Sequence, residues 1–187
     1  MNVRTKNLKI DGAYELIFRP FSDDRGHFTK LFGHPEVTEI WGDKQSVKQI
    51  NFSENKHKGT MRGLHFQSYP YAENKMVFCL VGEVYDVILD CRPNSRSFGK
   101  HDFIQLCARK NNAVFIPQGV AHGFQTLQDN SSLLYFHENV YQPEYSFGIN
   151  AFDPDLNLNW PLPVTVCSME DKALPRFEKY KERFIGL

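Results

Sequence analysis

Two short segments carry histidines in settings that suit acid–base chemistry or metal binding. The segment TMRGLHFQ, residues 60–67, brings Arg62, His65 and Gln67 close together in the sequence. Gly63 permits an unusual backbone conformation between them. On a regular strand Arg62 and His65, three residues apart, would face opposite sides of the sheet. An imidazole exchanges protons near neutral pH, but a strand histidine taken alone is more often a hydrogen-bonded structural residue than a catalyst.

The second segment, PQGVAHGF at residues 117–124, matches the PxGxxH part of a motif found in cupin barrels. In that motif the proline and glycine shape a turn, and the histidine, here His122, points into the barrel. Metal-binding cupins take further ligands from an HxH pair, which reads His65-Phe66-Gln67 in this chain. Because a transition-metal site usually needs three or more protein ligands, we expect a barrel without a metal ion. His122 is equally compatible with a hydrogen bond to the turn and with contact to a pocket.

Strand signals dominate the middle of the chain. Residues 75–91 are rich in β-branched and aromatic side chains and are interrupted at Gly82, which predicts a hairpin. In the second half of this segment Asp86 and Asp90 share one face, so the strand borders either solvent or a polar cavity. Further strands are predicted, with turn residues between them, at residues 101–107, 113–117, 123–128 and 132–140.

Helical periodicity is weak by comparison. The clearest candidates are residues 34–42 and the charged segment 170–184, where Pro175 limits any helix. Short strands separated by regular turns are typical of a sandwich or a barrel. We therefore predict a mainly β fold, a cupin-like jelly-roll barrel with a few short peripheral helices, forming a single domain over residues 1–187.

Composition narrows the classes of function and the compartment. The 187 residues include 22 basic and 22 acidic side chains, a balance that argues against a nucleic-acid binder or a polybasic membrane anchor. No apolar run approaches the roughly 20 residues of a membrane span, and the N-terminal residues lack a secretory signal. Cys79, Cys91, Cys107 and Cys167 form no CxxC pair. We interpret them as reduced thiols and expect a cytoplasmic protein.

An ordered set of motifs gives the chain a more specific resemblance. The dTDP-4-dehydrorhamnose 3,5-epimerases show the same order of motifs, which read here DDRGHF, QINFS, RGLHFQ, ENKMV, GEVYDVILDCR, FIPQGVAHGF, VYQPE, DPDLNLNWP and CSMEDKALP. Together these cover roughly residues 20–175. The resemblance implies a jelly-roll homodimer with N-terminal strands exchanged between subunits, no cofactor, and a nucleotide-linked 4-keto-6-deoxyhexose as substrate.

The resemblance also implies roles for four side chains. His65 matches the general base, and Asp171 matches the aspartate that orients it. Lys75 matches the lysine beside the sugar ketone, and Tyr135 matches the tyrosine that delivers a proton from the opposite face. These residue types suit the reaction, because a hydrogen next to a ketone becomes acidic only when the enolate is stabilised, and inversion needs a base and an acid on opposite faces. The predicted reaction is epimerisation at C3, C5 or both.

Other matches concern the nucleotide and the sugar. Arg25, Gln49, Asn51 and Arg62 match positions that hold the diphosphate and nucleoside, and Tyr141 matches an aromatic that packs near the sugar. The complete predicted substrate-binding set is Arg25, Phe28, Lys30, Gln49, Asn51, Arg62, Gln67, His122 and Tyr141.

The chain departs from the family pattern at several of these sites. Lys30 stands where the family commonly has a glutamate that accepts a hydrogen bond from thymine. Lysine only donates, so Lys30 would suit an acceptor on another base, such as cytosine, or a phosphate. We therefore hypothesise a carrier other than dTDP, with CDP as the first alternative to test. Ser146, Glu73 and the pair Ala151-Phe152 also depart from the pattern near the sugar and base, and they leave the choice between C3 and C5 open.

Three other functions compete with epimerisation. A 3,4-ketoisomerase uses the same barrel and enolate chemistry, but it is expected to carry a second active-site histidine in a different pattern. A non-catalytic sugar-nucleotide-binding cupin would be favoured by the loss of a catalytic residue type, and none is lost. A metal-dependent cupin oxygenase is disfavoured because ligands are lacking.

Overall fold

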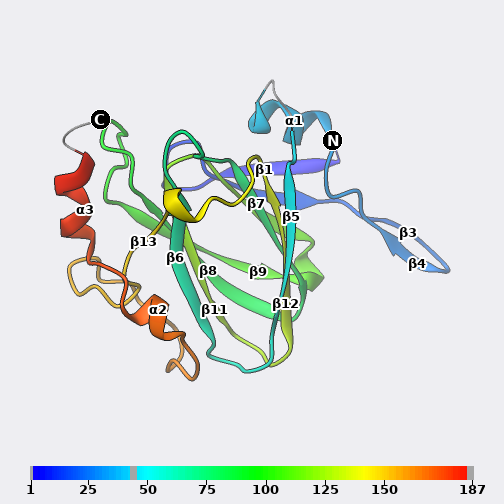
Figure 1. The fold of residues 1–187 in the computed structure, drawn as a ribbon. Helices are drawn as coiled ribbons and strands as arrows, with labels where there is room; N and C mark the ends of the chain where they lie inside the picture. Colours follow the sequence, from blue (N-terminus) through cyan, green and yellow to red (C-terminus); the bar gives the residue numbers. More distant parts are fainter. Residues whose placement is uncertain (1, 43–45, 185–187) are drawn as a thin grey trace.

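The structure is a computed structural model that describes residues 2–42 and 46–184. Two antiparallel sheets lie face to face and form a jelly-roll barrel, which confirms the predicted fold class (Figure 1). In spatial order, the first sheet contains β1 (Val3–Asn7), β2 (Tyr14–Phe18), β10 (Asn112–Ile116), β7 (Lys75–Val81), β12 (Ser131–His137) and β5 (Gln49–Asn55). The second contains β13 (Ser146–Gly148), β6 (Met61–Gln67), β11 (Val120–Thr126), β8 (Glu83–Asp90) and β9 (His101–Cys107).

A separate hairpin of β3 (Phe21–Asp23) and β4 (Gly26–Phe28) projects away from the barrel (Figure 1). Its strands pair only with each other among the described residues. Both strands are exposed, and the apolar rings of Phe21 and Phe28 are 66% and 72% accessible. Such exposure of large apolar side chains is typical of a surface that another molecule covers.

The helices are short and lie at the periphery of the barrel, as predicted (Figure 1). They are α1 (Pro35–Trp41), α2 (Met169–Lys172) and α3 (Phe177–Phe184), with 3-10 turns at Ala108–Lys110 and Pro143–Tyr145. The segment predicted at 170–184 divides around Pro175, because proline cannot donate the backbone hydrogen bond that a continuous helix needs.

The apolar side chains of the described residues form three clusters, one between the sheets and one on each outer face. Ile88 and Leu133 belong to the inner cluster. Trp41 of α1 covers the outer face of the first sheet. Phe177 of α3 packs with Leu89 on the outer face of the second sheet. Both faces of β8 are therefore largely buried, and Asp86 and Asp90 are fully buried, so the solvent interpretation is wrong. Val84 and Ile88, which share their face, belong to the inner apolar cluster.

The hairpin predicted over residues 75–91 does not form. Strands β7 and β8 occupy the predicted positions, but β7 pairs with β10 and β12 in one sheet while β8 pairs with β9 and β11 in the other. Gly82, with φ +76°, turns the chain from one sheet to the other. A glycine turn reverses the chain in either arrangement, so local sequence does not distinguish a hairpin from a corner between sheets.

An irregularity in β6 brings Arg62 and His65 to the same pocket, contrary to the regular-strand expectation. His65 pairs with His122 of β11, and Arg62 pairs with Phe124. Between these two pairs β6 contains two residues and β11 contains one, so β6 has one extra residue. Gly63 occupies this bulge with φ +103°, a conformation that favours glycine. The extra residue restores Arg62 to the inward face.

We predict that Gly63→Ala destabilises the fold by about 2 kcal/mol or more, because positive φ and overpacking each carry a cost. An added Cβ would lie 2.7 Å from the Cα of Gly123 and from the carbonyl oxygen of His122. Urea unfolding measures the effect. Gly26→Ala is the matched control, because Gly26 also has positive φ but has nothing within 4 Å of an added Cβ. Equal losses in the two variants would contradict the steric argument.

Candidate active site

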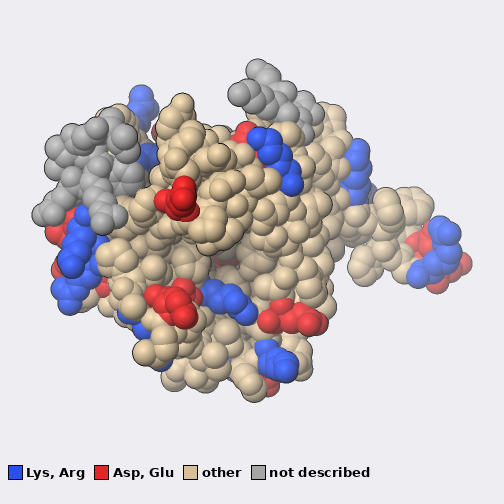
Figure 2. Space-filling model, viewed as in Figure 1, with Lys and Arg blue, Asp and Glu red and all other residues tan. Residues whose placement is uncertain are grey.

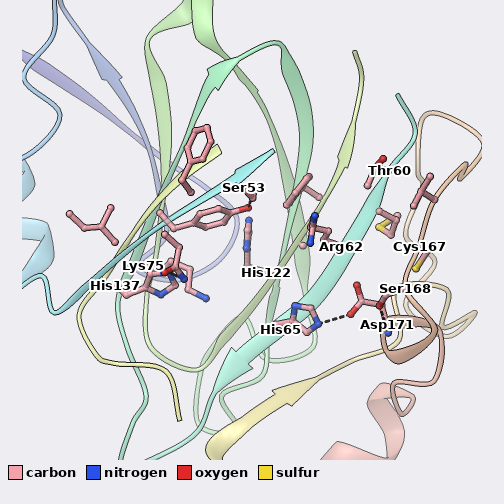
Figure 3. A pocket seen from close by; sticks show the side chains of 18 residues that line it. Ser53, Thr60, Arg62, His65, Lys75, His122, His137, Cys167, Ser168 and Asp171 are labelled. Atoms are coloured by element: carbon pink, nitrogen blue, oxygen red, sulfur yellow. Dashed lines mark hydrogen bonds and ion pairs between the residues drawn. The ribbon is translucent and has the colours of Figure 1, made fainter. Parts of the chain in front are cut away.

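A cavity of about 830 Å³ opens between the sheets. Strands β5, β7 and β12 of the first sheet, β6 and β11 of the second, and residues 166–168 with Asp171 form its walls. Figure 3 shows His65 and Asp171 on one side of this pocket, with Lys75 and His137 side by side across from them. On the molecular face seen in Figure 2, basic and acidic side chains are interspersed rather than gathered in one patch.

His65 and Asp171 form a hydrogen-bonded pair at 2.7 Å between Nε2 and Oδ1 (Figure 3). The second carboxylate oxygen of Asp171 accepts from the backbone amide of Gly63 at 3.1 Å. Ser168 caps α2 and accepts from the backbone amide of Asp171 at 3.0 Å. Asp171 is therefore held in two ways, through a helix cap and through the β6 bulge.

The pair has a defined electrostatic character. Burial alone would raise the pKa of Asp171, but the hydrogen bond and charge of His65 and the bond from Gly63 outweigh burial and hold the pKa below its ordinary value. A carboxylate accepts, so His65 donates from Nε2 and leaves Nδ1 with a free lone pair. The side chain of His65 is 48% exposed, so this lone pair is open to a ligand as a base.

Tyr135 and Lys75 line the pocket from the first sheet, which faces the sheet that carries His65. The hydroxyl of Tyr135 lies 3.1 Å from the hydroxyl of Ser53. Burial raises the pKa of Tyr135 well above its ordinary value, so the hydroxyl keeps its proton at neutral pH. The pocket therefore holds a base on one wall, a protonated hydroxyl on the facing wall, and an amine beside it.

His122 lies in β11 rather than in the preceding turn, and its Nε2 is 2.7 Å from Oδ2 of Asp86. Of the two alternatives left open for His122, the structure shows the contact with the pocket, and the ring bonds to Asp86 rather than to the turn. Burial raises the pKa of Asp86, more than the charge and hydrogen bond of His122 lower it. Both side chains of this second pair are buried, and His122 is the one that lines the pocket.

A third histidine–carboxylate pair was not predicted from the sequence. His137 lines the pocket, and its Nδ1 lies 3.1 Å from Oε1 of Glu73. The same oxygen is 3.6 Å from Nζ of Lys75. Two signals point to it: His137 follows Tyr135 by two residues on one strand, and Glu73 precedes Lys75 by the same interval.

Most of the predicted substrate-binding residues come together. Asn51, Arg62 and His122 line the main cavity, while Gln49, Gln67 and Tyr141 line an adjoining recess of about 210 Å³ that also includes Ser146. Asn51, His65, Lys75 and His137 border both.

Three predicted residues do not line this pocket. Arg25 and Phe28 belong to the projecting β3–β4 hairpin, where Arg25 forms an ion pair with Asp23 at 2.5 Å. Lys30 follows the hairpin and donates to the carbonyl oxygen of Gly33 at 2.6 Å. These three residues do not reach the pocket of their own chain, so their substrate-binding roles stay predictions.

The remaining features concern thiols, metals and membranes. The four cysteines are free, and Cys79, Cys91 and Cys107 are buried. Burial raises the pKa of the Cys79 thiol to about 12, which makes it a poor nucleophile. Within residues 2–42 and 46–184, no group of three His, Cys, Asp or Glu side chains is arranged to hold a metal ion. No helix in this part of the chain is long and apolar enough to cross a membrane.

Comparison with known proteins places this geometry in a family. The family model described as dTDP-4-dehydrorhamnose 3,5-epimerase matches residues 7–179. The chain belongs to the dTDP-4-dehydrorhamnose 3,5-epimerase family. It is 40% identical over 158 residues to the Shigella flexneri epimerase, covering 83% of this chain and 87% of the relative. It is 33% identical over 198 residues to the enzyme of Mycobacterium tuberculosis strain CDC 1551, covering 98% of each.

Solved structures of epimerases share the fold closely. The 3,5-epimerase of Legionella pneumophila, in complex with dTDP-4-keto-L-rhamnose, has a TM-score of 0.87 at 34% identity, covering 94% of this chain and 93% of that one. A 3'-monoepimerase of Streptomyces bikiniensis, in complex with dTDP-quinovose, has a TM-score of 0.87 at 29% identity, covering 94% and 89%. The chain is therefore an isomerase of the epimerase class, as predicted.

We predict that Asp171→Asn makes the epimerase less stable at neutral pH, and that the difference shrinks in acid. Because the pKa of Asp171 is lower in the folded chain than in the unfolded one, its carboxylate contributes stability that is present above the unfolded pKa and is lost as pH falls through the folded pKa. Urea unfolding of both proteins from about pH 6 to about pH 3 measures the gap. A gap that stays constant over this range would contradict the assignment.

Proposed function

We propose that this epimerase inverts C3, C5 or both in a nucleotide-diphosphate-linked 4-keto-6-deoxyhexose, through an enolate. The observation that carries the proposal is the placement of His65 with Asp171 on one wall of a single pocket and Tyr135 with Lys75 on the facing wall. Inversion requires a base and an acid on opposite faces of one carbon, and this arrangement provides them.

The first step uses His65 as the base. Its Nδ1 accepts the hydrogen next to the ketone as a proton, and the electron pair of the C–H bond moves to the ketone oxygen. The ammonium group of Lys75 stabilises the developing oxyanion, an interaction that can be worth several kcal/mol in a site shielded from water. Asp171 stabilises the imidazolium that forms, through the bond at 2.7 Å.

The second step returns a proton from the other face. The hydroxyl of Tyr135 donates to the carbon, the carbonyl re-forms, and the configuration is inverted. The raised pKa of Tyr135 keeps this proton in place until the enolate, a strong base, receives it. Proton exchange with solvent then restores Tyr135 and His65. Only protons move, so the reaction needs no redox cofactor.

We further propose that two chains assemble so that the β3–β4 hairpin of one reaches the pocket of the other. The proposal is supported by three observations: the hairpin projects from its own barrel, it exposes Phe21 and Phe28, and it carries Arg25 outside the pocket of its own chain (Figure 1). In such a homodimer Arg25, Phe28 and Lys30 would meet the nucleotide in trans. Arginine suits the diphosphate because its planar fork pairs with phosphate oxygens.

We also propose a cytoplasmic location, supported by the four unpaired cysteines. Cell fractionation that recovers the protein outside the cytoplasm would overturn this.

The enolate mechanism predicts hydrogen exchange with solvent. Incubated in heavy water with dTDP- and CDP-linked 4-keto-6-deoxyglucose, the protein should incorporate deuterium at C3, C5 or both, followed by NMR. His65→Ala should reduce exchange about 10²- to 10⁴-fold, the usual contribution of a general base. Tyr135→Phe should keep exchange on the His65 face and lose inversion, because the base remains.

The exchange assay, together with thermal-shift measurements, also tests which nucleotide carries the sugar and whether the epimerase mechanism operates. Lys30 leads us to expect a preference for the CDP-linked substrate. Clear stabilisation by dTDP and none by CDP in a thermal-shift measurement would remove the CDP hypothesis. Absence of exchange with both substrates would contradict the epimerase mechanism.

The trans arrangement of the hairpin predicts complementation between two inactive variants. Arg25→Ala and His65→Ala should each be strongly impaired alone. An equimolar mixture that has exchanged subunits should recover about a quarter of wild-type activity, because about half of its dimers are mixed and one of the two sites in each mixed dimer is intact. Activity that stays at the level of the single variants, in verified mixed dimers, would show that the hairpin does not act in trans.

A further inference from the structure

A row of polar side chains crosses the first sheet beside the catalytic residues. His137 of β12 lies between Gln49 of β5 and Lys75 of β7, and the three are direct cross-strand partners. Asn51 lies opposite Tyr135 in the next inward pair. Strand register thus places the imidazole of His137 between the side-chain amides of Gln49 and Asn51 on one side and the amine of Lys75 on the other.

These groups are joined by a continuous series of hydrogen bonds. The backbone amide of Tyr141 donates to Oε1 of Gln49 at 2.8 Å, and Nε2 of Gln49 donates to Oδ1 of Asn51 at 3.0 Å. Nδ2 of Asn51 then lies 3.3 Å from Nε2 of His137. Nδ1 of His137 lies 3.1 Å from Oε1 of Glu73.

The ends of the series fix the direction of every bond within it. A backbone amide only donates and a carboxylate only accepts. Gln49 must therefore accept through its oxygen and donate through its nitrogen, and Asn51 must do the same. His137 is left as a neutral ring that accepts at Nε2 and donates from Nδ1. Reversing any one group would set two donors or two acceptors against each other.

This direction determines what the pocket presents to a ligand. The amide nitrogens of Gln49 and Asn51 each use one hydrogen within the series and keep a second. Both residues border the pocket. They therefore offer N–H donors, which suit the oxygens of a diphosphate, and the series prevents the amides from turning their oxygens toward that anion.

The last member of the series also anchors Lys75. Oε1 of Glu73 lies 3.6 Å from Nζ of Lys75, and both side chains are largely buried, at 6% and 13% exposure. Oε2 of Glu73 has no hydrogen-bond partner among the described residues. The ring of His137 also stacks on Tyr135, with centroids 6.1 Å apart and planes at 24°. One carboxylate thus holds both the imidazole and the catalytic amine.

We propose that His137 and Glu73 are positioning residues with separable effects. His137 holds Gln49 and Asn51 as donors toward the anionic part of the substrate, and Glu73 holds the ammonium of Lys75 against the pocket wall. The proposal deepens the proposed function and rests on it, because the ligand is taken to be a nucleoside diphosphate attached to the reacting sugar.

The test separates binding from turnover. Binding of dTDP, CDP and inorganic pyrophosphate is measured by calorimetry, and kcat and KM come from deuterium exchange. His137→Phe keeps a ring against Tyr135 but removes both nitrogens, so nucleotide affinity should fall about tenfold, the effect of losing one oriented hydrogen bond. His137→Gln should restore affinity to within about twofold, because its oxygen can accept from Asn51 while its nitrogen donates to Glu73.

Glu73→Gln tests the second part of the proposal, the role of Glu73 in holding Lys75. Its oxygen can still accept from His137, so nucleotide affinity should stay within about twofold, while kcat should fall about tenfold because Lys75 loses its charged anchor. Glu138→Gln is the matched control. The carboxylate of Glu138 accepts from the backbone amide of Asn74 at 3.0 Å and from Gln118 at 2.9 Å, and it does not line the pocket, so neither quantity should change.

The outcomes distinguish this inference from the function on which it rests. Wild-type protein that binds neither nucleotide and exchanges no deuterium overturns the proposed function and this inference with it. Active wild-type protein whose affinity is the same in His137→Phe, or equally weak in His137→Gln and His137→Phe, overturns the role of His137. Unchanged kcat in folded Glu73→Gln overturns the role of Glu73. Circular dichroism and urea unfolding establish that each variant is folded.

Discussion

An ionisable side chain inside a β-barrel is costly to bury unless a partner lies within hydrogen-bond distance. This barrel meets that constraint with three imidazole–carboxylate pairs among its described residues: His65 with Asp171, His122 with Asp86, and His137 with Glu73. Each pair restricts the proton positions of its histidine and so determines what that ring presents to the cavity. The same pairing that makes burial tolerable thus prepares the pocket for acid–base chemistry.

The two-sheet architecture divides the chemical roles. His65, the proposed base, stands on β6 of one sheet, while Lys75 and Tyr135 stand on β7 and β12 of the other. Strands packed on both faces hold these groups more rigidly than loops would, which matters because proton transfer to carbon requires close control of distance and angle. Only Asp171 comes from outside the sheets, and it is fixed by the cap of α2 and by the amide of Gly63.

The points at which sequence and structure differ share one cause. Local sequence predicts a hairpin at Gly82 and places Arg62 and His65 on opposite faces, because both inferences use only neighbouring residues. The pairing partners of β7, and the bulge that admits one extra residue in β6, depend on strands that are distant in the sequence, as in the pairs Phe78–Ala113 and Arg62–Phe124. Strand alternation puts His137 on the same face as Tyr135, but it does not show the contacts of His137 with Glu73 and Asn51, which are distant in the sequence.

The amino-acid sequence alone was enough to predict the mainly β class, the candidate catalytic residue types and, through the ordered motifs, the family. These depend on side-chain chemistry, on alternation along each strand and on short-range turn residues, all of which are local. The three-dimensional fold was needed to show which side chains share a cavity, which nitrogen of His65 is free, and that Arg25, Phe28 and Lys30 stand apart from the pocket of their own chain. Those outcomes follow from register between distant strands, which no local pattern specifies.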